Sequence, residues 1–427
     1  MPTFALVDCN NFFASCEQLF DPRLRGVPVV VLSNNDGCIV ARSAEAKALG
    51  VPMGLPWFKA REAARRHGIV ARSSNYALYA DMSNRVVEIL SDFAPDYEVY
   101  SIDESFLAFD SVPPAERATH AAALRERVRH WLGLSVCIGI GPSKTLAKLA
   151  NHCAKKQLAG ANGVCDFADL SRTALDALLA RIPVGEVWGV GRRLAPRLEA
   201  EGITSVRDLR DADPARLARR YSVVLERTVR ELRGNSCLQL DEMAQARQQI
   251  LRSRSFGTRI YDLSSLCEAV SHHVAHAAEA LRRQGSLAGM LAVCLRTGMH
   301  EPDPSRYIGH QGLPLCPPTD DTRTLTATAA RLAQRLYRPG YAYAKAGVLL
   351  SDLTARHPVQ ADLFAAPGPS PDSLRLMQAL DDINARWGRG TLRLAAEGTT
   401  QDWQMKRALL SPRYTTDWAG LPVARAG

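Results

Sequence analysis

The sequence predicts an α+β protein of several domains, and three observations support this prediction. The chain has 427 residues, enough for about three domains at roughly 150 residues each. Short apolar, strand-like runs alternate with helical patterns in residues 1–170 and again in 251–355. Residues 171–240 are instead rich in arginine, helical in pattern and poor in strand signals. Two mixed units joined by a helical segment follow from these patterns.

In the first unit, strands are expected where apolar residues run together: 4–9, 27–32, 134–141 and two strands within 97–109. Helices are expected where apolar residues recur at helical spacing: 12–20, 115–132 and 143–156. This order of elements resembles a ferredoxin-like sheet with an excursion at about residues 33–75.

The second unit is expected to begin after a polar linker, DEMAQARQQI, at 241–250. Its strands are expected within 253–261, 289–297 and 343–353, and its helices at 265–284 and 322–337. The segment APGPSP indicates a loop at 366–371, and a further helix is expected at 372–387.

Composition narrows the class of protein. The formal net charge of +9 favours polyanionic partners without proving them. No run of about 18 apolar residues is present, so no membrane span is expected. The N-terminal segment lacks a basic region and a cleavage site, so we do not expect a signal peptide. Ten scattered cysteines without CxxC spacing are typical of buried thiols in a reducing cytosol rather than a zinc site or disulfide framework.

Three carboxylates stand beside apolar strands. Asp8 ends the first strand, and Asp103 and Glu104 lie at the junction of two others. A charged carboxylate in such surroundings is costly unless it is paired or binds a metal. Acids on neighbouring strand ends suit two Mg²⁺ ions about 3.5–4 Å apart. Spacing alone leaves open the alternative that these carboxylates face water.

Longer motifs carry a family resemblance. The segments DCNNFFASCEQ, SNYALYADMS, YSIDESFL and GIGPSKTLAKLANHCAKK resemble the Y-family DNA polymerases in order and spacing. NNDGCIVARSAEAKALGVPMG and LSPRYTTDW are typical of its UmuC-like branch, to which the catalytic subunit of bacterial DNA polymerase V belongs. The resemblance covers almost the whole chain.

The resemblance implies a right-hand polymerase of four parts with a tail. The expected bounds are a ferredoxin-like palm at 1–32 and 76–170, small fingers at 33–75, a helical thumb with a helix-hairpin-helix at 171–240, a linker at 241–250, an α+β little finger at 251–355 and a C-terminal tail at 356–427.

The resemblance also implies an activity. The protein is expected to be a template-directed DNA polymerase that transfers a nucleotide from a dNTP to a primer 3′-hydroxyl and releases pyrophosphate. It would act in error-prone translesion synthesis during the SOS response, as a cytoplasmic protein that works at the nucleoid. Implied partners are primer-template DNA, the sliding clamp, RecA and a UmuD′-type accessory dimer. The alternatives are a catalytically inactive DNA-binding scaffold at the clamp and a two-metal nuclease.

The same resemblance assigns residues to the active site. Asp8, Asp103 and Glu104 would hold two Mg²⁺ ions. Phe13 would be the steric gate that excludes a ribose 2′-hydroxyl, although the UmuC-like branch usually has tyrosine there. The remaining expected nucleotide-binding residues are Asn10, Asn11, Phe12, Lys47, Tyr79 and Lys155. Lys144 and Lys148 share a helix face with Lys155 and are weaker candidates for DNA phosphates. Without the resemblance, core aromatics and a solvated lysine stripe would explain these residues.

Other residues are expected to hold DNA. In the thumb these are Gly189 and Gly191, which allow close approach to a phosphate, followed by Arg192 and Arg193. A tight helix–helix turn is the alternative. In the little finger they are Arg252 and Arg254, which alternate along a strand and therefore share a face.

The tail contains a short motif, QADLF, that resembles a clamp-binding peptide. Gln360 would make polar contacts while Leu363 and Phe364 enter an apolar pocket. The rest of the tail, 372–427, has aromatics such as Trp403 in a polar setting. We hypothesise that these aromatics are exposed and contact a partner protein.

Overall fold

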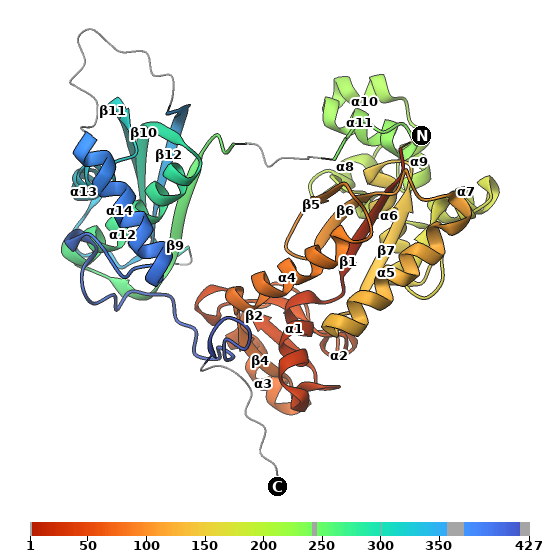
Figure 1. Ribbon diagram of the computed structural model, residues 1–427, viewed down its shortest axis with the longest axis horizontal. Helices are drawn as coiled ribbons and strands as arrows, with labels where there is room; N and C mark the ends of the chain where they lie inside the picture. The colour runs from red at the N-terminus through yellow and green to blue at the C-terminus, as the bar shows by residue number, and fades with distance from the viewer. Residues whose placement is uncertain (1, 241–245, 300, 357–370, 419–427) are drawn as a thin grey trace. The chain divides into compact units, whose positions relative to one another are not determined.

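The protein is described here by a computed structural model that covers residues 2–240, 246–299, 301–356 and 371–418. The chain forms two compact units. The first comprises residues 1–33, 37–244 and 409–427, and the second comprises 34–36 and 245–408. Both units contain sheets and helices, so the predicted α+β class is confirmed (Figure 1).

A five-stranded sheet forms the centre of the first unit. Its strand order is β5-β6-β1-β7-β8, and β1 pairs antiparallel with both β6 and β7. The strands are β1 (Phe4–Cys9), β5 (Tyr97–Val99), β6 (Glu104–Ala108), β7 (Val136–Gly141) and β8 (Val164–Asp166).

Helices cover both faces of this sheet. Successive side chains of a strand point to opposite faces. In β1, Ala5 and Val7 therefore join a core with α1 (Phe12–Phe20), α4 (Tyr76–Ser91) and α5 (Arg117–Leu132). On the other face, Phe4 and Leu6 pack with Ala147 of α6 (Lys144–Lys156).

Glycines in β7 let α6 lie directly on the sheet. A Cβ atom at Gly139 would stand 1.9 Å from the backbone nitrogen of Asn151, and one at Gly141 would stand 2.9 Å from that of Ala147. The side-chain amide of Asn151 donates hydrogen bonds to the carbonyl oxygens of Leu6 (3.2 Å) and Cys137 (2.7 Å). The close approach therefore fixes α6 against β1 and β7.

A smaller sheet of order β3-β2-β4 also belongs to the first unit. It contains β2 (Val29–Leu32), β3 (Ile39–Arg42) and β4 (Val70–Ser73), with α2 (Ala44–Ala48) and α3 (Trp57–His67). We expected β2 in the palm, but it pairs with β3 and β4. The side chains of β2 explain this: Val29 and Val31 join the main core, whereas Val30 and Leu32 pack in the core of α3. The expected boundary between palm and fingers, after residue 32, therefore separates β2 from β3 and β4 of the same sheet.

The arginine-rich segment is helical, as its composition predicted. It contains α7 (Arg172–Arg181), α8 (Ala195–Glu199), α9 (Val206–Asp211), α10 (Pro214–Arg220) and α11 (Val223–Leu232). Its buried side chains share one core with residues of α6. Short 3-10 turns occur in both units: Pro22–Leu24, Asn34–Asp36, Pro114–Glu116, Phe167–Asp169, Val184–Glu186 and Ala395–Glu397.

The second unit is built on a four-stranded sheet of order β11-β10-β12-β9. Its elements are β9 (Ile250–Ile260), α12 (Leu263–Arg283), β10 (Ser286–Thr297), β11 (Ile308–Thr319), α13 (Thr322–Leu336) and β12 (Tyr343–Ala355). β11 was not expected, because its three prolines, Pro314, Pro317 and Pro318, are unfavourable in a strand. Proline cannot donate to a ladder, and β11 tolerates it because it lies at the sheet edge.

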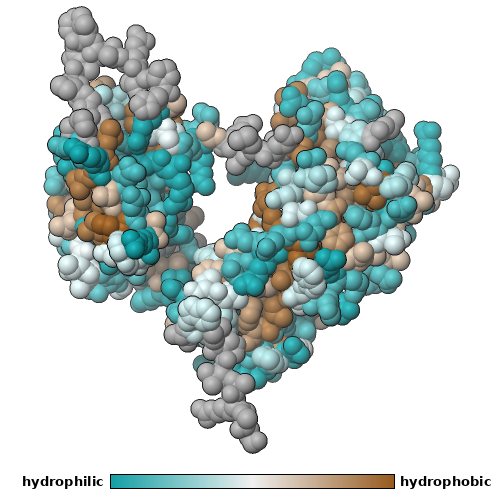
Figure 2. All heavy atoms as spheres, in the orientation of Figure 1, coloured by the Kyte–Doolittle hydropathy of each residue, from teal (hydrophilic) through white to brown (hydrophobic). Residues whose placement is uncertain are grey.

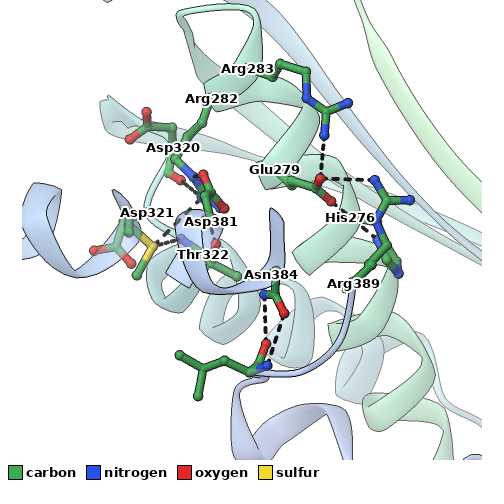
Figure 3. Close-up of polar contacts among 12 residues, drawn as sticks. His276, Glu279, Arg282, Arg283, Asp320, Asp321, Thr322, Asp381, Asn384 and Arg389 are labelled. Carbon is green, nitrogen blue, oxygen red and sulfur yellow. Dashed lines mark hydrogen bonds and ion pairs between the residues drawn. The ribbon is translucent and has the colours of Figure 1, made fainter. Parts of the chain in front are cut away.

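The helix expected at 372–387 is confirmed as α14 (Pro371–Trp387). Arg282 of α12 is nearly buried and donates to both carboxylate oxygens of Asp381, at 2.7 Å each (Figure 3). Arg389 pairs with Glu279 at 3.0 Å. Trp403 is only 7% exposed and packs near Phe256. The expectation that Trp403 is exposed was therefore wrong, because this part of the tail folds onto the second unit.

The surface of each unit, the state of the cysteines and the helices can be compared with what the composition predicted. Hydrophilic residues cover much of the visible face of each unit (Figure 2). All ten cysteines are free thiols. The expectation that they are buried was wrong for Cys237, in the segment after α11, and for Cys316, on the edge strand β11, because both are exposed. Within the described ranges, no helix is both long and apolar enough to cross a membrane.

The packing of α6 yields a first prediction. Gly139→Ala should lower the free energy of unfolding of the first unit by about 3 kcal/mol, because the new methyl group meets helix backbone that cannot move aside. Urea unfolding measures the change. Gly191→Ala is the matched control, because no atom lies within 4 Å of its Cβ position. Equal stability of Gly139→Ala and the unsubstituted chain would contradict this account of α6.

Candidate active site

Asp8 and Glu104 face each other on the side of the sheet that carries α6. They are directly opposed in the antiparallel pairing of β1 and β6, so their side chains share a face. Strand alternation places Asp8 on the same face as Phe4 and Leu6, which pack with α6. Asp8 is only 6% exposed, and Glu104 is half-buried.

Lysines of α6 neutralise these carboxylates. Lys155 forms an ion pair with Asp8, and the Lys148 ammonium lies 2.7 and 2.9 Å from the two oxygens of Glu104. The two lysines are two helical turns apart and therefore share a face of α6. Lys144, one turn earlier, is buried and pairs with Glu98 of β5. The lysine row is thus not a solvated stripe.

Burial dominates the electrostatics of Asp8. It raises the pKa of this carboxyl to about 7, although the attraction of Lys155 opposes the shift. The nearby Glu104 raises the pKa further. A negative charge at Asp8 is therefore costly unless a cation accompanies it.

Asp103 lies beside this pair but is held differently. Its carboxylate accepts a hydrogen bond of 2.8 Å from the Ser101 hydroxyl, and its carbonyl oxygen accepts one of 2.9 Å from the backbone N–H of Cys9. Within the part of the chain that the structure describes, no three His, Cys, Asp or Glu side chains form a ready metal cluster. The structure thus brings Asp8 and Glu104 together and keeps the side chain of Asp103 on Ser101.

The donor chemistry of this edge fits Mg²⁺. Asp8, Asp103 and Glu104 offer only carboxylate oxygens, which are the hard ligands that Mg²⁺ prefers. The buried Asp8 beside a second carboxylate also needs positive charge nearby, which lysines supply in this structure. The three residues therefore suit a divalent cation in type and charge.

The turn after β1 faces basic residues. The Asn10 backbone N–H donates to the carbonyl of Ser135 at 2.9 Å, and Asn11 has a left-handed backbone with φ of 52°. Lys47 of α2 donates a hydrogen bond to the Asn11 side-chain oxygen. Burial lowers the pKa of Lys47, and Arg42, Lys155 and Lys156 lower it further by repulsion. Several cations therefore gather near this turn.

An aromatic cluster stands at the start of α1 and α4. The Phe13 ring stacks on Tyr79, with centroids 4.4 Å apart and planes 14° apart, and Tyr76 meets its edge at 6.3 Å. Tyr79 is fully buried, and its hydroxyl donates to Glu17 at 2.6 Å. Phe12 is also buried, whereas Phe13 is half-exposed. Tyr79 thus supports Phe13, and a direct nucleotide contact by Tyr79 stays a prediction.

The candidate DNA-binding residues of the arginine-rich segment 171–240 lie in and just after the turn at residues 189–191. Gly189 has a φ of 89°, and the Cβ positions of Gly189 and Gly191 are open. Val190 between them is buried and anchors the turn. Arg192 and Arg193 follow as exposed residues. The geometry leaves the backbone of this turn accessible.

The second unit contains the remaining candidates. Arg254 of β9 is exposed, and Arg252 is half-buried. Burial lowers the pKa of Arg252, and the nearby Arg247, Arg389 and Arg254 lower it further. The predicted clamp-binding residues Gln360, Leu363 and Phe364 lie outside the residues that the structure describes.

Two contacts at the candidate site were not predicted from the sequence. Neither Glu17, a buried carboxylate on the apolar helix α1, nor the pairing of Lys148 with Glu104 was singled out. The acid inside FFASCEQLF was a usable signal, because a carboxylate within an apolar helix needs a partner. The partner of Lys148 depends on sheet register, which the lysine spacing does not encode.

Family models match most of the chain. The model of the impB/mucB/samB family matches residues 7–152, and that of its C-terminal domain matches 247–363. A domain of unknown function, DUF4113, matches 374–424.

Curated relatives extend over nearly the full length. The chain is 45% identical to Protein UmuC of Salmonella typhimurium, over 98% of this chain and 99% of the relative. It is 30% identical to DNA polymerase IV of Moorella thermoacetica, over 92% of this chain and 96% of the relative.

Solved structures share the fold. An insertion ternary complex of Dbh DNA polymerase matches with a TM-score of 0.56 and 20% identity, over 83% of this chain and 99% of the other. The fold is thus that of Y-family polymerases. Taken with the family models and the full-length relatives, this establishes that the chain belongs to the impB/mucB/samB family.

Proposed function

We propose that the protein is a template-directed DNA polymerase of the translesion type. It transfers a nucleotide from a dNTP to a primer 3′-hydroxyl, and pyrophosphate leaves. The observation that carries the proposal is the buried Asp8 opposite Glu104 beneath the lysines of α6. Full-length similarity to relatives named UmuC and DNA polymerase IV supports it.

The carboxylates form the reaction centre. Asp8, Asp103 and Glu104 would hold two Mg²⁺ ions. When bound, these ions supply activation of the primer 3′-oxygen and neutralisation of charge on the leaving pyrophosphate. The Ser101 hydroxyl keeps the Asp103 carboxylate hydrogen-bonded beside the pair.

Basic side chains would bind the triphosphate. Lys155 and Lys47 stand beside the turn of Asn10 and Asn11. Burial lowers the pKa of Lys47, and repulsion from the neighbouring cations lowers it further. An anion bound among these cations would offset that repulsion. The Asn10 N–H is already bonded to Ser135, so the further donors for phosphate oxygens are the first backbone N–H groups of α1, which begins at Phe12.

Phe13 would select the sugar. Its ring is fixed by stacking on the buried Tyr79 and therefore resists displacement. A ribose 2′-hydroxyl would meet this ring, whereas deoxyribose would fit beside it. Ring bulk does the excluding, so phenylalanine suffices where tyrosine is usual.

Other parts of the chain would hold DNA without reading its sequence. The open Gly189–Gly191 turn offers backbone N–H groups to a phosphate, and Arg192 and Arg193 add charge. Arg252 and Arg254 would contact the phosphate backbone from the little finger. In this proposal, the five-stranded sheet is the palm, the β3-β2-β4 sheet belongs to the fingers, and α7 to α11 form the thumb.

Partner proteins complete the proposal. The motif with Gln360, Leu363 and Phe364 would bind the sliding clamp. A UmuD′-type dimer and RecA would act with the polymerase during the SOS response, as the UmuC-like resemblance implies. A non-catalytic scaffold is not favoured, because DNA binding alone gives no reason to bury Asp8 opposite Glu104.

A carboxylate substitution tests the reaction centre. Asp8→Asn should slow Mg²⁺-dependent primer extension by about a thousandfold or more. It removes a charged ligand from a metal site that lowers the activation free energy by several kcal/mol. Chelation of Mg²⁺ should have the same effect on the unsubstituted chain, and DNA affinity should remain. Single-turnover primer extension measures the rate.

The control for this experiment is Asp92→Asn, since Asp92 is an exposed carboxylate paired with Arg127. Undiminished extension by Asp8→Asn would contradict the assignment. Shortening of the primer in the absence of dNTPs would instead indicate the nuclease alternative.

The steric gate is tested by comparing the insertion of ribonucleotides and deoxyribonucleotides. Phe13→Ala should raise the incorporation of ribonucleotides relative to deoxyribonucleotides by at least about tenfold, because a missing ring leaves room for the 2′-hydroxyl. Phe13→Tyr should preserve discrimination. The ratio of kcat/KM for a matched dNTP and rNTP measures both variants, and unchanged discrimination in Phe13→Ala would remove Phe13 as the gate.

A further inference from the structure

Glu17 is a buried carboxylate outside the proposed metal site. It lies on α1, one helical turn after Phe13, and is only 1% exposed. One of its oxygens accepts hydrogen bonds from the hydroxyls of Tyr79, at 2.6 Å, and Ser411, at 3.1 Å. A carboxylate so deeply buried depends on the donors that remain to it.

Ser411 belongs to a C-terminal strap, which we define as residues 409–414. The strap begins with two hydrogen bonds between Leu409 and Ser73 of β4. The Ser73 N–H donates to the Leu409 carbonyl, and the Leu409 N–H donates to the Ser73 hydroxyl, each at 3.0 Å. Near its end, the Tyr414 ring stacks on Phe20 of α1, with centroids 5.2 Å apart and planes 9° apart. The strap is therefore anchored at both ends.

Asn75 ties the strap to α4. Its buried side-chain amide donates to the Ser411 hydroxyl at 2.9 Å, to the Ser411 carbonyl at 3.3 Å and to the Pro412 carbonyl at 3.1 Å. Its side-chain oxygen caps α4 by accepting the Leu78 N–H at 3.4 Å. The first turn of α4 carries Tyr76 and Tyr79, which flank Phe13. The strap thus touches both helices that carry the aromatic cluster.

A continuous series of contacts leads from the strap to the gate. Ser411 binds Glu17, Glu17 binds Tyr79, and Tyr79 stacks on Phe13. Three of these side chains are buried and have few alternative positions. These contacts give a route by which a change at Ser411 would reach the Phe13 ring.

We propose that the C-terminal strap is a positioning element for sugar selection and that Ser411 is its principal positioning residue. This gives a role to the end of the region that matches the domain of unknown function. The proposal rests on the proposed polymerase activity and on Phe13 as its steric gate. Ser411 itself need not touch a nucleotide, because it acts through Glu17 and Tyr79.

The test uses the full-length chain with Ser411→Ala. Losing this hydroxyl removes one donor to Glu17 and one acceptor of Asn75. We expect discrimination between dNTP and rNTP to fall about three- to tenfold, the scale of one or two hydrogen bonds. The change should appear as a lower KM for the rNTP, while kcat for the matched dNTP stays within about twofold. Ser411→Thr, which keeps the hydroxyl, should restore discrimination.

The control is Ser91→Ala, because Ser91 is an exposed serine at the end of α4 whose hydroxyl donates to the Glu88 carbonyl of its own helix. It should discriminate like the unsubstituted chain. Unchanged discrimination in Ser411→Ala, with dNTP insertion intact, would overturn the proposal. So would an equal fall in dNTP and rNTP insertion, since that indicates general loss of structure.

A second measurement does not depend on catalysis. Hydrogen–deuterium exchange of the unliganded protein should be faster in Ser411→Ala at residues 12–20 and 76–83, and unchanged in Ser91→Ala. If the chain inserts no nucleotide at all, the polymerase proposal fails on its own, and exchange still reports on the strap. Unaltered exchange at both segments would contradict the positioning role.

Discussion

The structure depends above all on the burial of Asp8 opposite Glu104 beneath α6. Register places the two carboxylates together, and Gly139 lets α6 approach closely enough for its lysines to reach them. Loss of one partner would leave the other charge partly buried and unpaired, so these ion pairs tie the strands and α6 together at the site. The result is a place where acids suited to Mg²⁺ adjoin lysines suited to phosphate.

The aromatic cluster of Phe13, Tyr76 and Tyr79 depends on similar constraints. Phe13 is held by Tyr79, and Tyr79 by Glu17, so a buried polar contact supports a partly exposed apolar ring. The C-terminal region takes part in both units. α14 is attached through the Arg282–Asp381 pair, whereas the strap packs on α1 and α4 of the first unit. This region is therefore part of the folded protein and not only a tail.

Local patterns predicted much of this fold. Apolar runs gave β1 and β7, and helical spacing gave α5 and α14, because these signals depend on neighbouring residues. The acidic residues were found from their position beside apolar strands, the motif resemblance assigned them to the active site, and their metal-binding role stays a prediction. Features that depend on distant segments were not predictable. β2 contributes to two cores, and β11 contains prolines that only an edge position tolerates. The contacts of Glu17 with Ser411 join residues at opposite ends of the chain.

The most direct test of the account is nucleotide insertion opposite an abasic site. The intact chain would be assayed with Mg²⁺, clamp, RecA and a UmuD′-type dimer, on damaged and undamaged templates, beside Asp103→Ala. The account predicts insertion on both templates by the intact chain and none by Asp103→Ala. If the intact chain bound DNA but inserted no nucleotide on either template, it would behave like Asp103→Ala. That result would contradict polymerase activity at this carboxylate site.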